Sequence, residues 1–319
     1  MSPAAFSRRL LCALAAAAAC ALLCPGAAQA QVSQSSMPLD EGFGPLDPTQ
    51  PSIPVAQIIK EFTAKETLFS EALDDYTWTR SVRVQSLDDD GHPNGQYYQV
   101  VDIYYTPEGE RMERVTDAPV GKLYDTTCSS DNPTCNGEIM MTEKDFSDIE
   151  QRLPFVLTTQ DAAQYDITYM GQQKVDQIDT WVFEVKPKAL EKNKRYFQGR
   201  IWVDQKEHQI VVTDGKNVPD DLRPNHMDLT LPFITYRQMV DGKYWFPVYT
   251  VGEATLHFVA GHGYLSDNAR LRETVKYTNY HQFRTSIRVL YNGQDITNNG
   301  QPPGQPNGQQ PAQAPAKPQ

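Results

Sequence analysis

The sequence lacks the short patterns that mark common enzyme sites, and basic residues are scarce. None of G-x-S-x-G, Walker A, G-x-G-x-x-G or H-E-x-x-H occurs among its 319 residues. It has 29 Lys and Arg against 40 Asp and Glu, and this acidic excess argues against binding nucleic acid or anionic lipid surfaces. The chain is therefore expected not to be an enzyme and to need no cofactor.

Histidines are few as well, and they give no clear metal site. The best candidates are His257 and His262, with Glu253 before them. On a strand, Glu253 and His257 would share one side but lie about 13 Å apart at a rise of about 3.3 Å per residue. Only a bend at Gly261 would bring such ligands together, so no metal is predicted.

Residues 1–30 have the pattern of a signal peptide. Arg8 and Arg9 precede an apolar run, and a small-residue cleavage site ends at Ala30. The run is shorter than the roughly 20 residues that span a bilayer, so no transmembrane segment is expected in the mature chain. The prediction is export to the periplasm with cleavage after Ala30; a lipid anchor at Cys20 is the alternative.

Cleavage would leave two of the five cysteines, Cys128 and Cys135. Two cysteines six residues apart in an oxidising compartment predict a local disulfide, and no histidine lies near them to favour a metal. Without Arg8 and Arg9, 27 basic residues remain against 40 acidic ones, a net charge of −13.

Composition divides the mature chain into three parts. Residues 31–53 are rich in Ser, Gln, Pro and Gly and are predicted to be flexible. Residues 292–319 are rich in Pro, Gln, Asn and Gly, and such a tail cannot bury enough apolar surface to offset its ordering entropy. The region between them, 54–291, suits one domain.

Hydrophobic periodicity predicts one long helix and roughly ten antiparallel strands. The helix covers 54–73, where apolar residues recur on one face, and a shorter helix is expected over 142–153. Alternating β-branched and aromatic residues mark the strands. The strand-like runs include YDITYMG, DTWVFEVKPK, FQGRIWVD, HQIVVTDG, PFITYRQMV, KYWFPVYT and EATLHFVA, the last two as separate strands. The expected fold is α+β and mainly antiparallel, in a sheet that splits or curls.

The strand block at 165–216 resembles the periplasmic lipoprotein-carrier family of LolA, LolB and the sensor RseB. The resemblance rests on Y-x-I-x-Y-x-G from Tyr165, on W-x-F-x-V-x-P-K from Trp181, and on Trp202-Val203-Asp204 at the end of the next strand. It covers about residues 54–260. It implies an unclosed half-barrel under a helical lid, with acyl chains held inside. The longer chain, the Cys128–Cys135 loop and the added strands depart from the carriers.

The resemblance and the alternation together predict an apolar site for the acyl chain of a lipid or lipoprotein. Candidate lining residues follow from alternation alone, and ordinary core packing is the alternative for each. They are Trp78, Val82, Val101, Ile103, Trp181, Phe183, Val185, Ile201, Val203, Leu256 and Phe258. The lid residues are Ile58, Ile59, Phe62 and Phe69. The alternative function is an envelope interaction or sensor module that binds a protein with the same concave sheet.

Overall fold

The structure is a computed structural model of the whole chain. It describes residues 41–106, 109–126, 138–139, 141, 145–146, 149, 155–220, 228–257, 268–283, 290–291 and 294–295. The predicted signal peptide, the two cysteines of the predicted disulfide and the final 24 residues lie outside these ranges. None of the helices within them has the length and apolar content needed to cross a membrane.

One antiparallel sheet of ten strands dominates the fold, in the order β3-β2-β1-β12-β11-β10-β9-β8-β7-β6. The chain runs as a meander from β6 to β12, and β12 then pairs with the early strand β1. The end strands β3 and β6 do not pair with each other, so the sheet is unclosed. The strands are β1 (Tyr76–Leu87), β2 (Pro93–Tyr105), β3 (Arg111–Asp117), β6 (Tyr165–Val175), β7 (Ile178–Pro187), β8 (Tyr196–Asp204), β9 (Ile210–Val218), β10 (Phe233–Val240), β11 (Tyr244–His257) and β12 (Asn268–Gln282).

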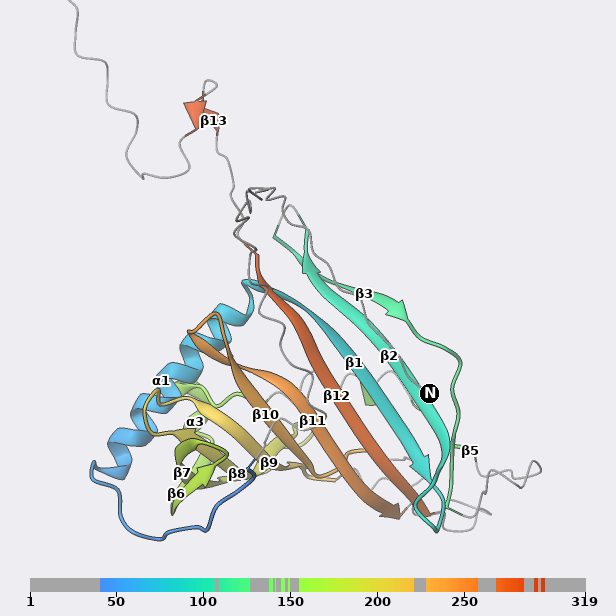
Figure 1. Cartoon of the computed structure of the whole chain (residues 1–319), viewed down its shortest axis with the longest axis horizontal. Helices are drawn as coiled ribbons and strands as arrows, with labels where there is room; N and C mark the ends of the chain where they lie inside the picture. The colour runs from blue at the N-terminus through green and yellow to red at the C-terminus, as the bar shows by residue number, and fades with distance from the viewer. Residues whose placement is uncertain are drawn as a thin grey trace, which may run out of the picture. The chain divides into compact units, whose positions relative to one another are not determined.

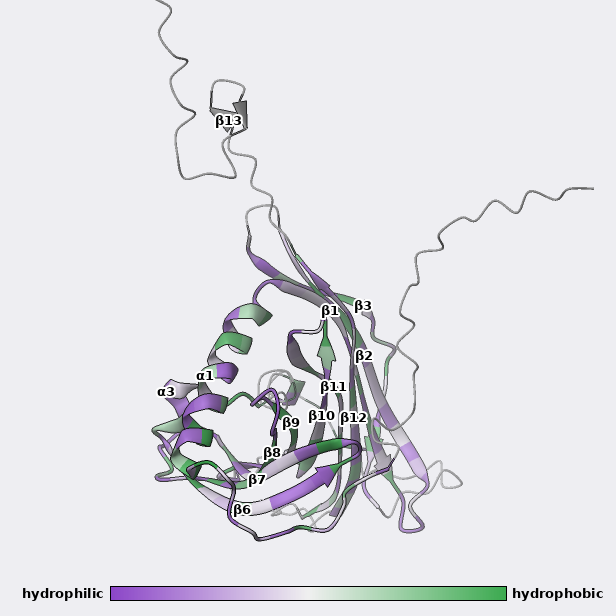
Figure 2. Ribbon diagram, turned by 60° about the vertical axis from the view of Figure 1, so that its left-hand side comes forward, coloured by the Kyte–Doolittle hydropathy of each residue, from purple (hydrophilic) through white to green (hydrophobic). Residues whose placement is uncertain are grey.

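A single long helix, α1 (Val55–Leu73), lies on the concave side of this curled sheet (Figures 1 and 2). It follows Pro54, whose φ of −58° suits the start of a helix. Its apolar stripe faces the sheet, with Ile58, Phe62 and Phe69 fully buried. The predicted fold class, about ten antiparallel strands in an unclosed sheet under a helical lid, is confirmed.

The outer edge of β6 is covered by the segment just after residue 40. The Asp47 N–H donates to the Gln172 oxygen (2.8 Å), and the Gln172 N–H donates back to Asp47 (2.7 Å). Gly171, at φ +144°, permits this approach, because a Cβ there would stand 2.4 Å from the Asp47 oxygen. The sequence predicted a flexible segment here. An edge strand offers unpaired backbone groups, and residues 43–47 bond to them.

One predicted strand boundary differs from the structure. The runs KYWFPVYT and EATLHFVA were predicted as separate strands, but β11 continues from Tyr244 through Gly252 to His257, where the described part of the second run ends. Of the helix predicted over 142–153, the structure describes Asp145, Phe146 and Ile149, and all three are helical. The remaining elements are α3 (Thr159–Ala162), β4 (Leu123–Tyr124), β5 (Glu138–Ile139), β13 (Leu290–Tyr291) and β14 (Gln294–Asp295).

Candidate functional site

The concave face of the sheet is the candidate site, and it collects most of the residues predicted to line a cavity. These side chains belong to one apolar cluster together with the underside of α1. The described members are Val82, Trp181, Phe183, Val185, Ile201 and Val203, all buried, with Trp78 and Leu256 packed against them. Val101 and Ile103 are also buried, and they pair across β1 and β2 with Arg80 and Trp78. Phe258 lies outside the described residues.

The predicted lid residues divide between two clusters. Ile58 and Phe62 are buried in the main cluster, and Ile59 packs against it. The Phe62 ring lies 5.5 Å from that of Phe183, between ring centroids. Phe69 instead joins Tyr76 and Phe246 near the other end of α1, where its ring meets Phe246 edge-on at 5.2 Å. Aromatic contacts therefore hold α1 near its middle and near its C-terminal end.

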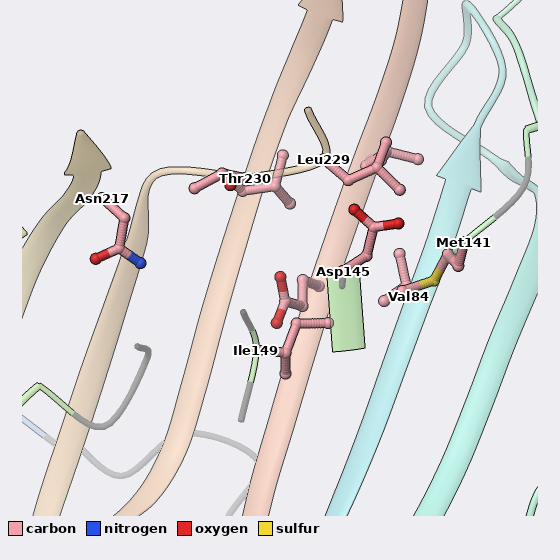
Figure 3. A pocket seen from close by; sticks show the side chains of 10 residues that line it. Val84, Met141, Asp145, Ile149, Asn217, Leu229 and Thr230 are labelled. Carbon is pink, nitrogen blue, oxygen red and sulfur yellow. The ribbon is translucent and has the colours of Figure 1, made fainter. Parts of the chain in front are cut away.

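The described side chains of the cluster pack closely against α1 on the concave face. A cavity of about 30 Å³ lies beside them, with room for about two water molecules. Its described lining comes from β1, β9, β12 and the chain around residues 141–149 and 229–231 (Figure 3). An apolar site for an acyl chain stays a prediction, and in this structure α1 packs against the residues that would line it.

A buried ion pair lies between α1 and the sheet. The Arg237 Nη1 atom of β10 donates to both carboxylate oxygens of Glu66, at 2.9 and 3.1 Å. The side chains are 1% and 0% exposed. Arg237 also donates to the Phe155 carbonyl, and Ile210 N–H donates to Glu66. Burial raises the pKa of Glu66 above its ordinary value, although Arg237 acts in the opposite direction.

A second buried carboxyl, Glu273 of β12, lines the small cavity. It is 7% exposed, and its Oε1 atom has no hydrogen-bond partner among the described residues. Burial raises the pKa of Glu273 to about 8. Gly252 lies opposite it on β11 and lets Pro232 come close, since a Cβ at Gly252 would stand 2.5 Å from the Pro232 oxygen. The chain at 229–232 can therefore close over this part of the sheet.

Neither buried carboxyl was predicted from the sequence. Glu66 follows Phe62 by four residues on the buried stripe of α1, but a charged residue within an amphipathic pattern is normally assigned to the polar face. Glu273 alternates with Leu271 and Val275 in β12 and could have been placed on their face. That alternation was the one available signal.

No group of three or more His, Cys, Asp or Glu side chains in the described ranges is placed to hold a metal.

The convex face has an apolar cluster of its own. Val175, Val182, Trp202 and Tyr236 are buried there, and the Phe43 ring lies 5.2 Å from Trp202. A hollow of about 350 Å³ opens beside this cluster. Its lining includes Val175, Ile178, Val212, Tyr236, Met239 and Trp245.

Comparisons with known proteins give structural likenesses only: no family model and no curated protein matches the sequence. A DUF1329 family protein from Desulfovibrio piger is 13% identical and has a TM-score of 0.30, with 74% of this chain and 93% of that chain covered. A candidate outer membrane lipoprotein-sorting domain from Vibrio parahaemolyticus is 12% identical, with a TM-score of 0.29 and coverages of 70% and 93%. MucB in complex with MucA(peri) is 9% identical, with a TM-score of 0.21 and coverages of 70% and 94%.

The chain is thus an unclosed antiparallel half-barrel with a helical lid, a description that rests on its own strand order.

Proposed function

We propose that this protein is a periplasmic carrier that binds the acyl chain of a lipid or lipoprotein on the concave face of its sheet. The structure would then be the closed, unloaded form, in which the apolar stripe of α1 occupies the place of the ligand. The observation that carries the proposal is the continuous apolar cluster between one helix and an unclosed sheet. Displacing α1 would expose that cluster to an apolar chain.

The ion pair between Glu66 and Arg237 supports a helix that opens. Replacing a buried pair with well-packed apolar residues is often neutral or stabilising, so such a pair is a poor choice for a permanent contact. Stability alone does not explain why the centre of this interface is polar. A polar contact can instead define one closed position of α1.

A direct test is the uptake of a pyrene-labelled acyl ester, combined with native mass spectrometry of the protein purified from cells. Phe62→Ala removes a ring beneath α1 and should increase uptake. The matched control is Phe43→Ala, the same change on the convex face, where the ring is 39% exposed. No co-purified lipid and no uptake by the wild type or by Phe62→Ala would refute the proposal.

The close packing of α1 against the apolar cluster supports a second candidate, an envelope interaction or sensor module that takes up no lipid. Crosslinking in the periplasm separates the two: a stable protein partner without bound lipid supports the module. Lipid that exchanges on the protein supports the carrier.

A further inference from the structure

The small cavity beneath residues 229–231 combines apolar walls with polar side chains, of which Asn217 and Glu273 are buried. Val84, Ile149, Leu229, Leu231 and Leu271 contribute the walls, and Glu273 contributes a carboxyl whose Oε1 atom has no partner among the described residues. Leaving a polar atom buried without a partner costs free energy, so it needs an explanation. In a protein that binds amphiphilic molecules, a polar head would supply the missing partner.

We propose that Glu273 binds the head of the acyl ligand, donating a hydrogen bond from its carboxyl group to the carbonyl oxygen of an ester. This inference rests on the proposed function and names the chemistry of its ligand. The apolar chain would lie along the concave face, and the ester would lie against Glu273. A carboxyl group can donate in this way only while it holds its proton.

The surroundings of Glu273 favour the protonated form at neutral pH. Desolvation raises its pKa to about 8, with no opposing cation among the described residues. Tyr277 follows four residues later in the same strand, with its own pKa raised by burial. Arg80 lies on the same face opposite Tyr277, and its guanidinium is within 3.5 Å of the Glu113 carboxylate. Asp145 lines the cavity from the other side (Figure 3).

The chemistry predicts a specific preference and a specific pH dependence. A neutral carboxyl should favour an ester over a hydrocarbon of equal length by about three- to ten-fold, the worth of one net hydrogen bond. Once ionised, the group has no proton to donate and faces the carbonyl oxygen with a negative charge. The ester preference should therefore disappear as the pH rises from about 6 to about 9.5. A cationic head would show the opposite trend.

The experiment titrates the full-length protein with two pyrene-labelled probes, a long-chain methyl ester and a hydrocarbon of the same length. Glu273→Leu should bind both equally, while Glu273→Gln keeps a donor and should retain the ester preference at every pH. Glu253→Gln is the matched control, because Glu253 pairs with Arg270 and Arg272 on the outer face of the neighbouring strand. It should behave like the wild type.

Each outcome decides the proposal. Suppose that the hydrocarbon binds but the protein shows no preference for the ester, or that the preference survives in Glu273→Leu or grows with pH. Glu273 is then not the head-group anchor, and only this inference fails. If neither probe binds, the proposed carrier function fails with it. Displacement of the ester probe by a diacylglycerol identifies a lipid as the source of the ester. Displacement only by a synthetic diacylated lipopeptide identifies a lipoprotein.

Discussion

Removing one member of the Glu66–Arg237 pair should destabilise the protein in an asymmetric way. Both side chains are at most 1% exposed, and removing one partner of a buried pair costs about 3–5 kcal/mol because the other charge stays buried. Glu66→Leu should have the full effect, because the Arg237 guanidinium cannot lose its proton. Arg237→Met should cost less, because the remaining carboxyl can take up a proton and become neutral.

The pH dependence of Arg237→Met follows from the same carboxyl. Burial already raises the pKa of Glu66, and removing Arg237 removes the strongest influence that lowers it. A carboxyl with a raised folded-state pKa stabilises the fold fully below its unfolded pKa, and that contribution is lost as the pH rises through the folded pKa. Arg237→Met should therefore approach wild-type stability in acid and lose stability toward neutral pH.

Urea unfolding of the wild type, both single variants and Glu66→Leu/Arg237→Met forms a double-mutant cycle. The double variant should be as stable as the wild type or more stable by about 1–4 kcal/mol. It should also take up acyl probe more slowly if α1 must open. The control is the exposed pair of Lys122 and Glu138, whose loss should change the unfolding free energy by less than about 1 kcal/mol. Single variants that cost less than about 1 kcal/mol would show that the pair is not desolvated as the structure indicates.

Three further changes test other parts of the structure. Glu273→Gln should leave the unfolding free energy unchanged below pH 4.5 and raise it by up to about 4 kcal/mol near pH 8. The reason is that the wild-type carboxyl has a pKa of about 8, so its contribution to stability is lost as the pH rises over that range. Urea titrations at both pH values check this. Phe62→Ala should lower the unfolding free energy by about 3–5 kcal/mol, since the ring is fully buried against Phe183. Gly171→Ala should release Asp47 from β6, because the added Cβ would collide with the Asp47 oxygen. Faster exchange of the Asp47 and Gln172 amides would show this release. Unchanged exchange would mean that the close approach of the two segments does not depend on glycine.

Alternation and helical periodicity were enough to predict most of the sheet and α1. The strands from β6 to β9 were predicted because each carries apolar residues on both faces or on alternate positions, bounded by clear turns. The break expected at Gly252 was wrong for a physical reason. This glycine accommodates the Pro232 carbonyl from a neighbouring segment, and a single sequence contains no sign of that contact.

The polar parts of the site could not be predicted in the same way. Glu66 and Arg237 are 171 residues apart, and nothing local to either indicates a partner. Whether the concave face is open or filled depends on how closely α1 approaches the sheet, a distance that periodicity does not determine. The edge segment at 43–47 bonds through its backbone, so its composition is uninformative.

The packing of α1 against the concave face also sets a minimum length for an apolar ligand, because the helix must lift before the ligand can bind. Lifting α1 exposes Ile58, Phe62 and Phe69, each at most 1% exposed, at a cost of roughly 2 kcal/mol per side chain, or about 6 kcal/mol in all. A buried methylene group contributes about 0.8 kcal/mol, so about eight of them must be buried before the open form is favoured. Esters of about six carbons should therefore fail to bind, while chains of about sixteen carbons should bind. Affinity that rises smoothly from the shortest chains, with no threshold, would mean that ligands enter without moving the helix.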